Sequence, residues 1–310
     1  MTTIKAKTKT KAKAKPKHNK SISLVLGSGG AKGLVHIGVI RWLVDNGYQI
    51  KSISGCSIGA LIGGIYAAGQ LDEFEKWARA ISKFELMTLL DLSWDKGGFI
   101  KGDKVINELT KLVGDKNIED LDIKFTAITT DIDNEKEIWI QDGGLFQAIR
   151  ASISIPMIFT PYSYKGKRVL DGGIFNPVPV GPTFVDHNDL TIAVNLGGRP
   201  QYETKKRKAS IKQIRELSLS PFKKRISRFL AGLIKNKGPS VPNWDAFEVA
   251  NQAVDAMQSQ IARHRLAAAA PNYLIEFPRN ICGTLEFNRA AELIDLGYQK
   301  AEEILKNAHK

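Results

Sequence analysis

The residues best suited to chemistry in this 310-residue sequence are a serine, an aspartate and a glycine-rich loop. Residues 55–59 read Gly-Cys-Ser-Ile-Gly, a pattern found both in ordinary tight turns and in the sharp turns that present a nucleophilic serine. The sequence predicts a strand at 50–54 and a helix at 58–68, so Ser57 lies in a strand-to-helix turn that lifts its hydroxyl above the sheet. Ser57 is therefore the candidate nucleophile, and we expect Cys56 to be a small packing residue.

The glycine-rich loop, residues 27–33 (GSGGAKG), follows a short apolar run that predicts a buried strand. A dinucleotide-binding fingerprint would require glycine at position 32, and a P-loop would require Ser or Thr after the lysine, so neither fits. Backbone amides without bulky side chains at the start of a helix stabilise negative charge on a bound group. We therefore expect the amides of Gly29, Gly30 and Ala31 to form an oxyanion hole. The alternative is a glycine turn that serves tight packing alone.

A serine hydroxyl needs a base at neutral pH, and Asp171 is the best candidate. It ends a predicted strand and precedes two glycines, which would place its carboxylate at the rim of the sheet with little bulk nearby. His36 lies on the helix after the glycine-rich loop and is expected to pack there. The downstream histidines lie in a polar loop, on an arginine-flanked helix and near the end of the chain; they are His187, His264 and His309. A triad esterase that uses one of these three is the competing interpretation.

Strands alternate with helices along most of the chain. Apolar runs predict strands at 22–26, 50–54, 125–130, 137–140, 169–170, 190–195 and 273–277. Helical periodicity predicts helices at 34–46, 58–68, 71–82, 103–113, 144–151, 243–266 and 286–306. A strand-helix-strand unit implies parallel neighbours with a right-handed crossover. We therefore expect an α/β fold, a three-layer α/β/α sandwich with a mainly parallel central sheet.

The net charge of +13 is concentrated in two segments. Eight of the first twenty residues are lysine, and residues 205–237 hold twelve Lys or Arg but one acid, so the rest of the chain is mildly acidic. We expect residues 1–20 to be a disordered Lys-rich tail, because almost nothing in them is apolar. Residues 21–310 are expected to form a single domain that includes a basic amphipathic segment at about 204–238.

Part of this basic segment has the pattern of a helix that lies on a membrane surface. Apolar side chains recur there at helical spacing and cationic ones occupy the remaining surface, which suits an anionic lipid interface. The residues expected to contact the membrane are Phe222, Lys223, Lys224, Arg225, Ile226, Arg228 and Phe229. An equally physical alternative is that the apolar stripe packs on the body of the protein and leaves a solvated basic face.

The motifs together resemble the patatin-like phospholipases in order, spacing and structural setting. The resemblance runs from residue 21 to about 200 and covers the glycine-rich loop, residues 55–59, and Asp171 with its two following glycines. It also covers residues 151–156 (ASISIP) and 176–179 (NPVP). Three such motifs in order are much more specific than any one of them.

The resemblance implies a catalytic dyad in which Ser57 is the nucleophile and Asp171 the base, with the amides around Gly29, Gly30 and Ala31 as oxyanion hole. Many relatives have three glycines and an arginine in the first motif, where this chain has Ser28 and Lys32. Lysine keeps the positive charge but lacks the planar donor fork of arginine. Lys32 is therefore a candidate contact for a substrate headgroup, or a charge that serves the loop itself.

The function that the resemblance implies is hydrolysis of ester bonds in phospholipids or lysophospholipids at membrane surfaces, through an acyl-enzyme intermediate. Neither a metal nor an organic cofactor is expected. Two cysteines are too few for a disulfide framework, so we expect a cytoplasmic protein, peripheral at the inner membrane face. The expected partners are a lipid ester and an anionic membrane surface rather than nucleic acid. The alternative is a non-catalytic protein that binds membranes or nucleic acid on a hydrolase fold.

Overall fold

The structure, a computed structural model, describes residues 19–82, 85, 102–156, 158–201 and 246–307. Within these residues, eight strands form one sheet in the order β5-β6-β3-β2-β1-β7-β8, and β4 pairs with β3. The strands are β1 (Ser21–Leu26), β2 (Gln49–Cys56), β3 (Lys124–Asp131), β4 (Lys136–Ile140), β5 (Tyr162–Tyr164), β6 (Lys167–Asp171), β7 (Leu190–Gly198) and β8 (Tyr273–Pro278).

The strand directions and order explain where a ligand site can form. β1 pairs in parallel with β2 and β7, β2 with β3, and β7 with β8. β4, β5 and β6 are antiparallel to their neighbours. The chain moves from β1 to β3 on one side and later returns to β7 on the other, so the strand order reverses beside β1, and sheets of this kind bind ligands at such a position. The expected α/β fold with a mainly parallel sheet is confirmed.

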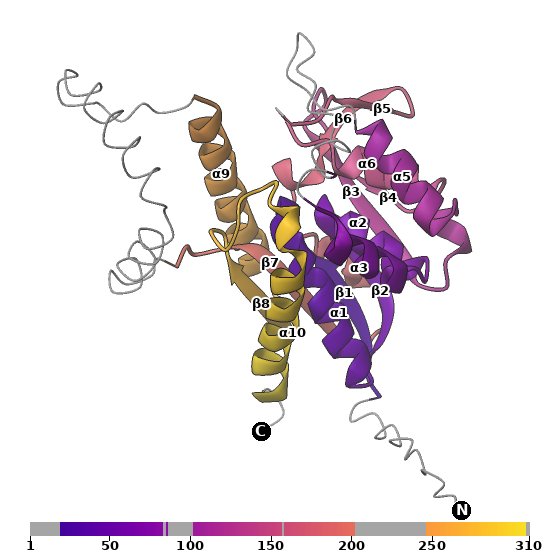
Figure 1. Ribbon diagram of the computed structural model, residues 1–310, viewed down its shortest axis with the longest axis vertical. Coiled ribbons are helices and arrows are strands. Elements are labelled where there is room, and N and C mark those ends of the chain that lie inside the picture. Colours follow the sequence, from indigo (N-terminus) through magenta and orange to yellow (C-terminus); the bar gives the residue numbers. More distant parts are fainter. Residues whose placement is uncertain (1–18, 83–84, 86–101, 157, 202–245, 308–310) are drawn as a thin grey trace, which may run out of the picture.

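Helices cover both faces of this sheet, as Figure 1 shows. On β1, Leu24 and Leu26 face the larger apolar core, which includes residues of α1 and α2, whereas Val25 faces a smaller core with Ala262 of α9. Alternate side chains of a strand point to opposite faces, so β1 is buried on both sides. The helices are α1 (Val35–Asp45), α2 (Ile58–Ala67), α3 (Leu71–Ala80), α5 (Asp103–Val113), α6 (Leu145–Ser152), α9 (Ala246–Ala268) and α10 (Ala290–Asn307).

Helices α1 and α10 lie side by side and approach each other at two glycines (Figure 1). A Cβ atom at Gly38 of α1 would lie 1.9 Å from the Ile294 carbonyl oxygen, and one at Gly297 of α10 would lie 2.1 Å from the Val35 carbonyl oxygen. No side chain fits at such distances, so the contact between the two backbones depends on both glycines. This contact fixes the C-terminal helix to the helix that follows the glycine-rich loop.

The elements differ from the predicted ones mainly at their ends. The helix predicted at 286–306 begins at Ala290, after a separate 3₁₀ turn over Phe287–Arg289. The short strand β5 was not predicted, because only three residues, Tyr162–Tyr164, extend along β6. None of the described helices is long and apolar enough to cross a membrane. Most of the predicted Lys-rich tail and the whole basic segment at about 204–238, with its membrane-contacting residues, lie outside the described residues.

Candidate active site

Ser57 occupies a strained turn between the end of β2 and the start of α2. Its φ angle is 55°, in the left-handed region that residues other than glycine rarely adopt. A Cβ atom at Gly59 would lie 2.1 Å from the Leu26 carbonyl oxygen, and one at Gly55 would lie 2.6 Å from the Gly59 carbonyl oxygen. Neither position has room for a side chain, and the close packing holds the serine in its strained conformation.

Ser152, at the end of α6, fixes the turn from the other side. The Ser57 amide donates a hydrogen bond to the Ser152 hydroxyl over 2.9 Å, and that hydroxyl donates to the Ile128 carbonyl of β3. Ser152 is fully buried, so its two hydrogen bonds are made without competition from water. The sequence analysis gave Ser152 no role; the signal it carried was a polar side chain at the end of an apolar helix.

Asp171, the last residue of β6, lies next to the serine turn. Its Oδ1 atom accepts a hydrogen bond of 2.7 Å from the Gly173 amide and a longer one of 3.9 Å from the Cys56 thiol. Burial and the negative charge of Asp171 raise the pKa of Cys56, so the thiol keeps its proton and can donate. Oδ2 is buried and accepts no hydrogen bond of ordinary geometry from the described residues. One carboxyl oxygen is thus held in place and the other is open to a further donor.

The Asp171 carboxyl is a stronger base than an exposed aspartate. Burial raises its pKa from 3.8 to about 6, because the charged form loses its solvation. Hydrogen bonding from the Ser57 side chain, the Gly173 amide and the Cys56 thiol favours the charged form and lowers the pKa in part. Asp171 is therefore charged at neutral pH and still able to take up a proton.

The glycine-rich loop runs past Ser57 with two of its amides open. Gly30 has a φ angle of 57°, and a Cβ atom there would lie 2.6 Å from the Thr284 carbonyl oxygen, so this position requires glycine. The amides of Gly29 and Gly30 donate to no acceptor among the described residues. The Ala31 amide donates to the Thr284 carbonyl over 2.9 Å. Two of the three amides expected in the oxyanion hole are thus open, and the third ties the loop to the C-terminal part of the chain.

The side chain of Lys32, in the same loop, is buried. Its Nζ atom lies 3.7 Å from the Asp255 carboxylate of α9, which is half-exposed. Lys32 also lines a pocket of mixed character, called the polar pocket here because Lys32, Asp171, Asn251 and Gln258 reach it. Among the residues that the structure describes, Asp255 is its one counter-ion, and a buried ammonium group at this distance can bind a second anion.

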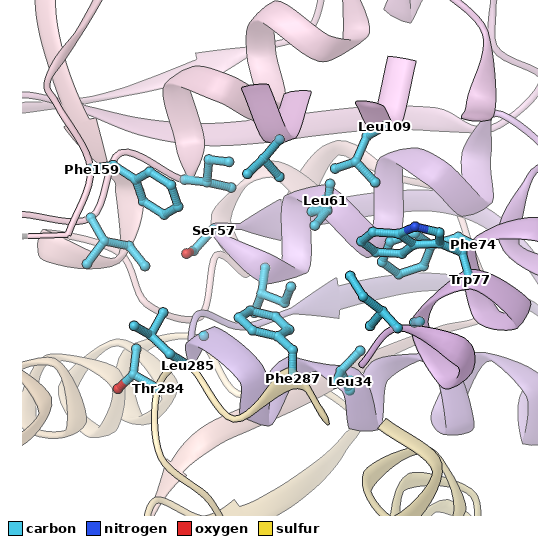
Figure 2. A pocket seen from close by; sticks show the side chains of 17 residues that line it. Leu34, Ser57, Leu61, Phe74, Trp77, Leu109, Phe159, Thr284, Leu285 and Phe287 are labelled. Carbon is cyan, nitrogen blue, oxygen red and sulfur yellow. The ribbon is translucent and has the colours of Figure 1, made fainter. Parts of the chain in front are cut away.

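An apolar cavity of about 90 Å³ opens beside Ser57, and Figure 2 shows the side chains around it. Its walls come from α2, α3, α5, the segment before α10, and Ile153, Ile155 and Phe159. Gly30 and Thr284 line both this cavity and the polar pocket of Lys32, so the two meet at the glycine-rich loop. The lining residues are Gly30, Leu34, Ser57, Ile58, Leu61, Phe74, Trp77, Ala78, Ile81, Val105, Leu109, Ile153, Ile155, Phe159, Thr284, Leu285 and Phe287.

His36 supports the glycine-rich loop from inside the core. Its Nε2 atom donates to the Gly27 carbonyl over 2.9 Å, which fixes the proton on that nitrogen. Burial lowers the pKa of His36 from 6.5 to about 4, so the ring is neutral at physiological pH. The expectation that His36 packs in its helix is in accord with complete burial of the side chain.

Two of the three downstream histidines are described, and both are exposed. His187 follows Asp186, whose carboxylate binds Ser52 and Lys124 at the start of β2 and β3, whereas Ser57 follows the end of β2. His187 therefore lies at the opposite end of the sheet from the serine. His264 lies on α9 beyond the residues that line the polar pocket. His309 lies outside the described residues.

Arg150 of α6 is a buried cation that the sequence analysis did not single out. Its guanidinium donates to Asp103 over 2.9 Å and to the Ser154 hydroxyl over 2.8 Å, and it also reaches Thr160. The same group lies 5.1 Å from the centre of the Tyr162 ring. Arg150 therefore links α5, α6 and β5, and it fixes the end of α6 that carries the serine-turn contact.

The site can be compared with known proteins. The family description "Patatin-like phospholipase" matches residues 24–184 of the chain. An uncharacterized NTE family protein of Mycobacterium tuberculosis is 35% identical to this chain, over 92% of it and 91% of its own length. The chain belongs to the patatin-like phospholipase family, as the motifs led us to expect.

More distant relatives include the lysophospholipase nte1 of Emericella nidulans, which is 29% identical over 93% of this chain and 18% of its own length. The lysophospholipase NTE1 of Coccidioides immitis is 28% identical over 92% of this chain. Among solved structures, VipD of Legionella pneumophila superposes with a TM-score of 0.42 and 16% identity, covering 94% of this chain and 67% of that chain.

Proposed function

We propose that this protein is a lipid acyl hydrolase that cleaves an ester bond of a phospholipid or lysophospholipid through a dyad of Ser57 and Asp171. The observation that carries the proposal is the setting of Asp171. Its carboxyl is buried beside the serine turn, with one oxygen held by Gly173 and the other open. A base arranged in this way can accept the serine proton without a histidine.

The reaction proceeds in two steps. Asp171 accepts the Ser57 proton as the serine oxygen attacks the ester carbonyl carbon, and the carbonyl oxygen becomes negative. The open amides of Gly29 and Gly30 and the positive end of α2 stabilise that charge. The alcohol half then leaves with the proton from Asp171, and the acyl group stays on Ser57. Water, deprotonated by Asp171, attacks the acyl-enzyme and releases the fatty acid, after which Ser57 regains its proton.

The Ala31 amide acts indirectly in this scheme. Its hydrogen bond to Thr284 is already made, so it orients the loop and leaves the contact with the oxyanion to its two neighbours. Removal of one oxyanion donor in other enzymes lowers kcat by about 100- to 1,000-fold. A distorted loop should cause a loss of that size.

The two cavities that meet at the glycine-rich loop suit the two halves of a lipid ester. The apolar cavity beside Ser57 takes the acyl chain, and the polar pocket takes the alcohol half, where Lys32 pairs with a phosphate. A single-chain lysophospholipid fits one apolar cavity next to one polar pocket. The names of the lysophospholipase relatives support the same substrate class.

Reaction with a fluorophosphonate probe tests this proposal. The full chain should react, and Ser57→Ala should not, because the probe forms a bond to the serine oxygen. Asp171→Asn should react much more slowly, and it should lower kcat for lysophosphatidylcholine by about 1,000-fold or more. Ser163→Ala and Asp142→Asn are matched controls, because both residues are exposed and lie outside the pockets.

The outcome separates the competing functions. A protein that only binds membranes or nucleic acid should not react with the probe. A triad esterase should lose the reaction in His264→Ala or His309→Ala and keep it in Asp171→Asn, whereas the dyad predicts the reverse.

A further inference from the structure

We propose that Trp77, packed against Phe74, closes the far end of the cavity beside Ser57 and so sets the length of the acyl chain that the protein accepts. The inference rests on the proposed function, because it assigns that cavity to the acyl chain.

One face of α3 forms a wall of the cavity. Four residues of this segment line it, and their spacing of three, four and seven from the first is that of a single helix face. They are Phe74, Trp77, Ala78 and Ile81. The wall therefore belongs to one rigid element, and each side chain covers a defined part of the cavity.

The aromatic pair lies at the end of the cavity away from the serine. Figure 2 shows Ser57 near Phe159 on one side, and Phe74 with Trp77 on the opposite side. The two rings of α3 contact each other with centroids 5.6 Å apart and an angle of 32° between their planes. Phe74 is buried, whereas Trp77 is half-buried at the edge of the core. An acyl chain that enters beside Ser57 would therefore meet this pair last.

Trp77 also separates the cavity from space beyond it. Trp77 and Ile81 line a second cavity, on the side of Glu85 and Glu108. Trp77 and Ile81 thus lie between the two cavities, and a smaller side chain at position 77 would let them join. Removing the indole should extend the acyl cavity outward without any change at the serine.

The polar face of α3 keeps the helix in place when residue 77 changes. Glu75 accepts a hydrogen bond of 2.9 Å from Arg41 of α1 and one of 2.8 Å from Arg79. Arg79 in turn donates to Asp295 of α10 over 3.1 Å. Because α3 is connected to two neighbouring helices on this side, a substitution at Trp77 should enlarge the cavity rather than move the helix.

The test compares acyl-chain preference in variants that lengthen or shorten the cavity. We would measure kcat/KM of the full chain for p-nitrophenyl esters from butyrate to palmitate. Trp77→Leu should raise the ratio of palmitate to octanoate by about tenfold or more, since one methylene in an apolar pocket changes kcat/KM by roughly that factor. Ala78→Met should lower the same ratio. Phe184→Ala is the control, because Phe184 is exposed and lines none of the described cavities.

A second readout does not depend on turnover. We would measure the binding of saturated fatty acids of increasing length to proteins that carry Ser57→Ala, by displacement of a fluorescent fatty acid. In this background, Trp77→Leu should favour binding of longer fatty acids, and Ala78→Met should favour shorter ones. If Trp77→Leu fails to fold, Trp77→Phe and Ala78→Met carry the test. Unchanged length preference in both assays would overturn the inference. Length-dependent binding without any Ser57-dependent hydrolysis would overturn the proposed function and leave the cavity assignment standing.

Discussion

At the scale of single residues, the chemistry of the site depends on how Asp171 is surrounded. The Gly173 amide and the Cys56 thiol hold one oxygen, burial raises the pKa to about 6, and the other oxygen is open toward the serine turn. The strained φ angle of Ser57 and the Ser152 contact keep the hydroxyl turn in one conformation. We propose that these local features together make a carboxylate a sufficient base.

Activity should therefore fall as the pH drops through about 6, because protonated Asp171 cannot accept the serine proton. With p-nitrophenyl butyrate, kcat/KM should decrease about tenfold per pH unit below that midpoint. Cys56→Ala should move the midpoint upward, since the thiol lowers the pKa of Asp171, whereas Cys56→Ser keeps a donor and should stay near the wild type. A profile that is level from about pH 5 to 8 would show that Asp171 is not the base.

The burial of Asp171 also lowers the free energy of unfolding at neutral pH. Its pKa is higher in the folded state than the ordinary 3.8, so folding binds a proton, and stability is lost as the pH rises from about 4 through 6. His36 acts in the opposite direction, because its folded-state pKa of about 4 lies below the ordinary 6.5. Through His36, the free energy of unfolding therefore increases as the pH rises over nearly the same range. The effects of His36 and Asp171 oppose each other in the wild type.

Asp171→Asn should separate these two effects. At neutral pH the variant should have a free energy of unfolding up to about 3 kcal/mol higher than the wild type, because roughly two pKa units of burial penalty disappear. The difference should vanish below about pH 3, where Asp171 is protonated in both the folded and the unfolded state. Denaturant titrations at several pH values check this. Parallel stability curves for the two proteins would contradict it.

At the scale of the elements, close backbone contacts position the site. The serine turn rests against β1 through Gly59, and α1 rests against α10 through Gly38 and Gly297. Because α10 follows the segment that carries Thr284 and Leu285, its contact with α1 also fixes the wall of the cavity and the acceptor of the Ala31 amide.

Gly38→Ala should destabilise the fold by about 1–3 kcal/mol, because the new methyl group would clash with the Ile294 carbonyl and push the two helices apart. Gly144→Ala is a matched control: its φ angle is −60°, and a Cβ atom there would lie 3.4 Å from its nearest neighbour, the side chain of Gln147. Thermal unfolding of both variants measures the difference. An equal effect of the two substitutions would show that the helix contact does not depend on Gly38.

At the scale of the whole molecule, the excess positive charge and the candidate active site lie in different parts of the chain. The part of the chain between the two basic segments is mildly acidic, while the tail and the segment at about 204–238 carry the excess lysine and arginine. We propose that these basic segments bring the protein to an anionic membrane, where its lipid ester is found.

Binding to vesicles tests this arrangement. Vesicles with anionic lipid should bind the full chain, and binding should weaken with added salt because exposed charges are screened. Replacing Phe222 and Phe229 by serine should weaken binding further if that segment inserts its apolar face. Phe184→Ser is the control, since this exposed aromatic lies outside the basic segment. Equal binding to neutral vesicles, or no effect of the paired substitution, would contradict the membrane role.

The sequence by itself determined the elements that carry the site. Strand and helix periodicity defined β1, β2 and α2 closely, since hydrophobic spacing reflects local backbone geometry, and glycine reveals positions where a side chain would clash. The same local information led to Ser57, Asp171 and the glycine-rich loop, and to the family. Only the tertiary structure decided which distant segments of the chain contact one another. Thr284 meets Ala31, Ser152 meets Ser57, and Trp77 ends the cavity, because side chains far apart in the chain meet only once the sheet order and helix packing are set.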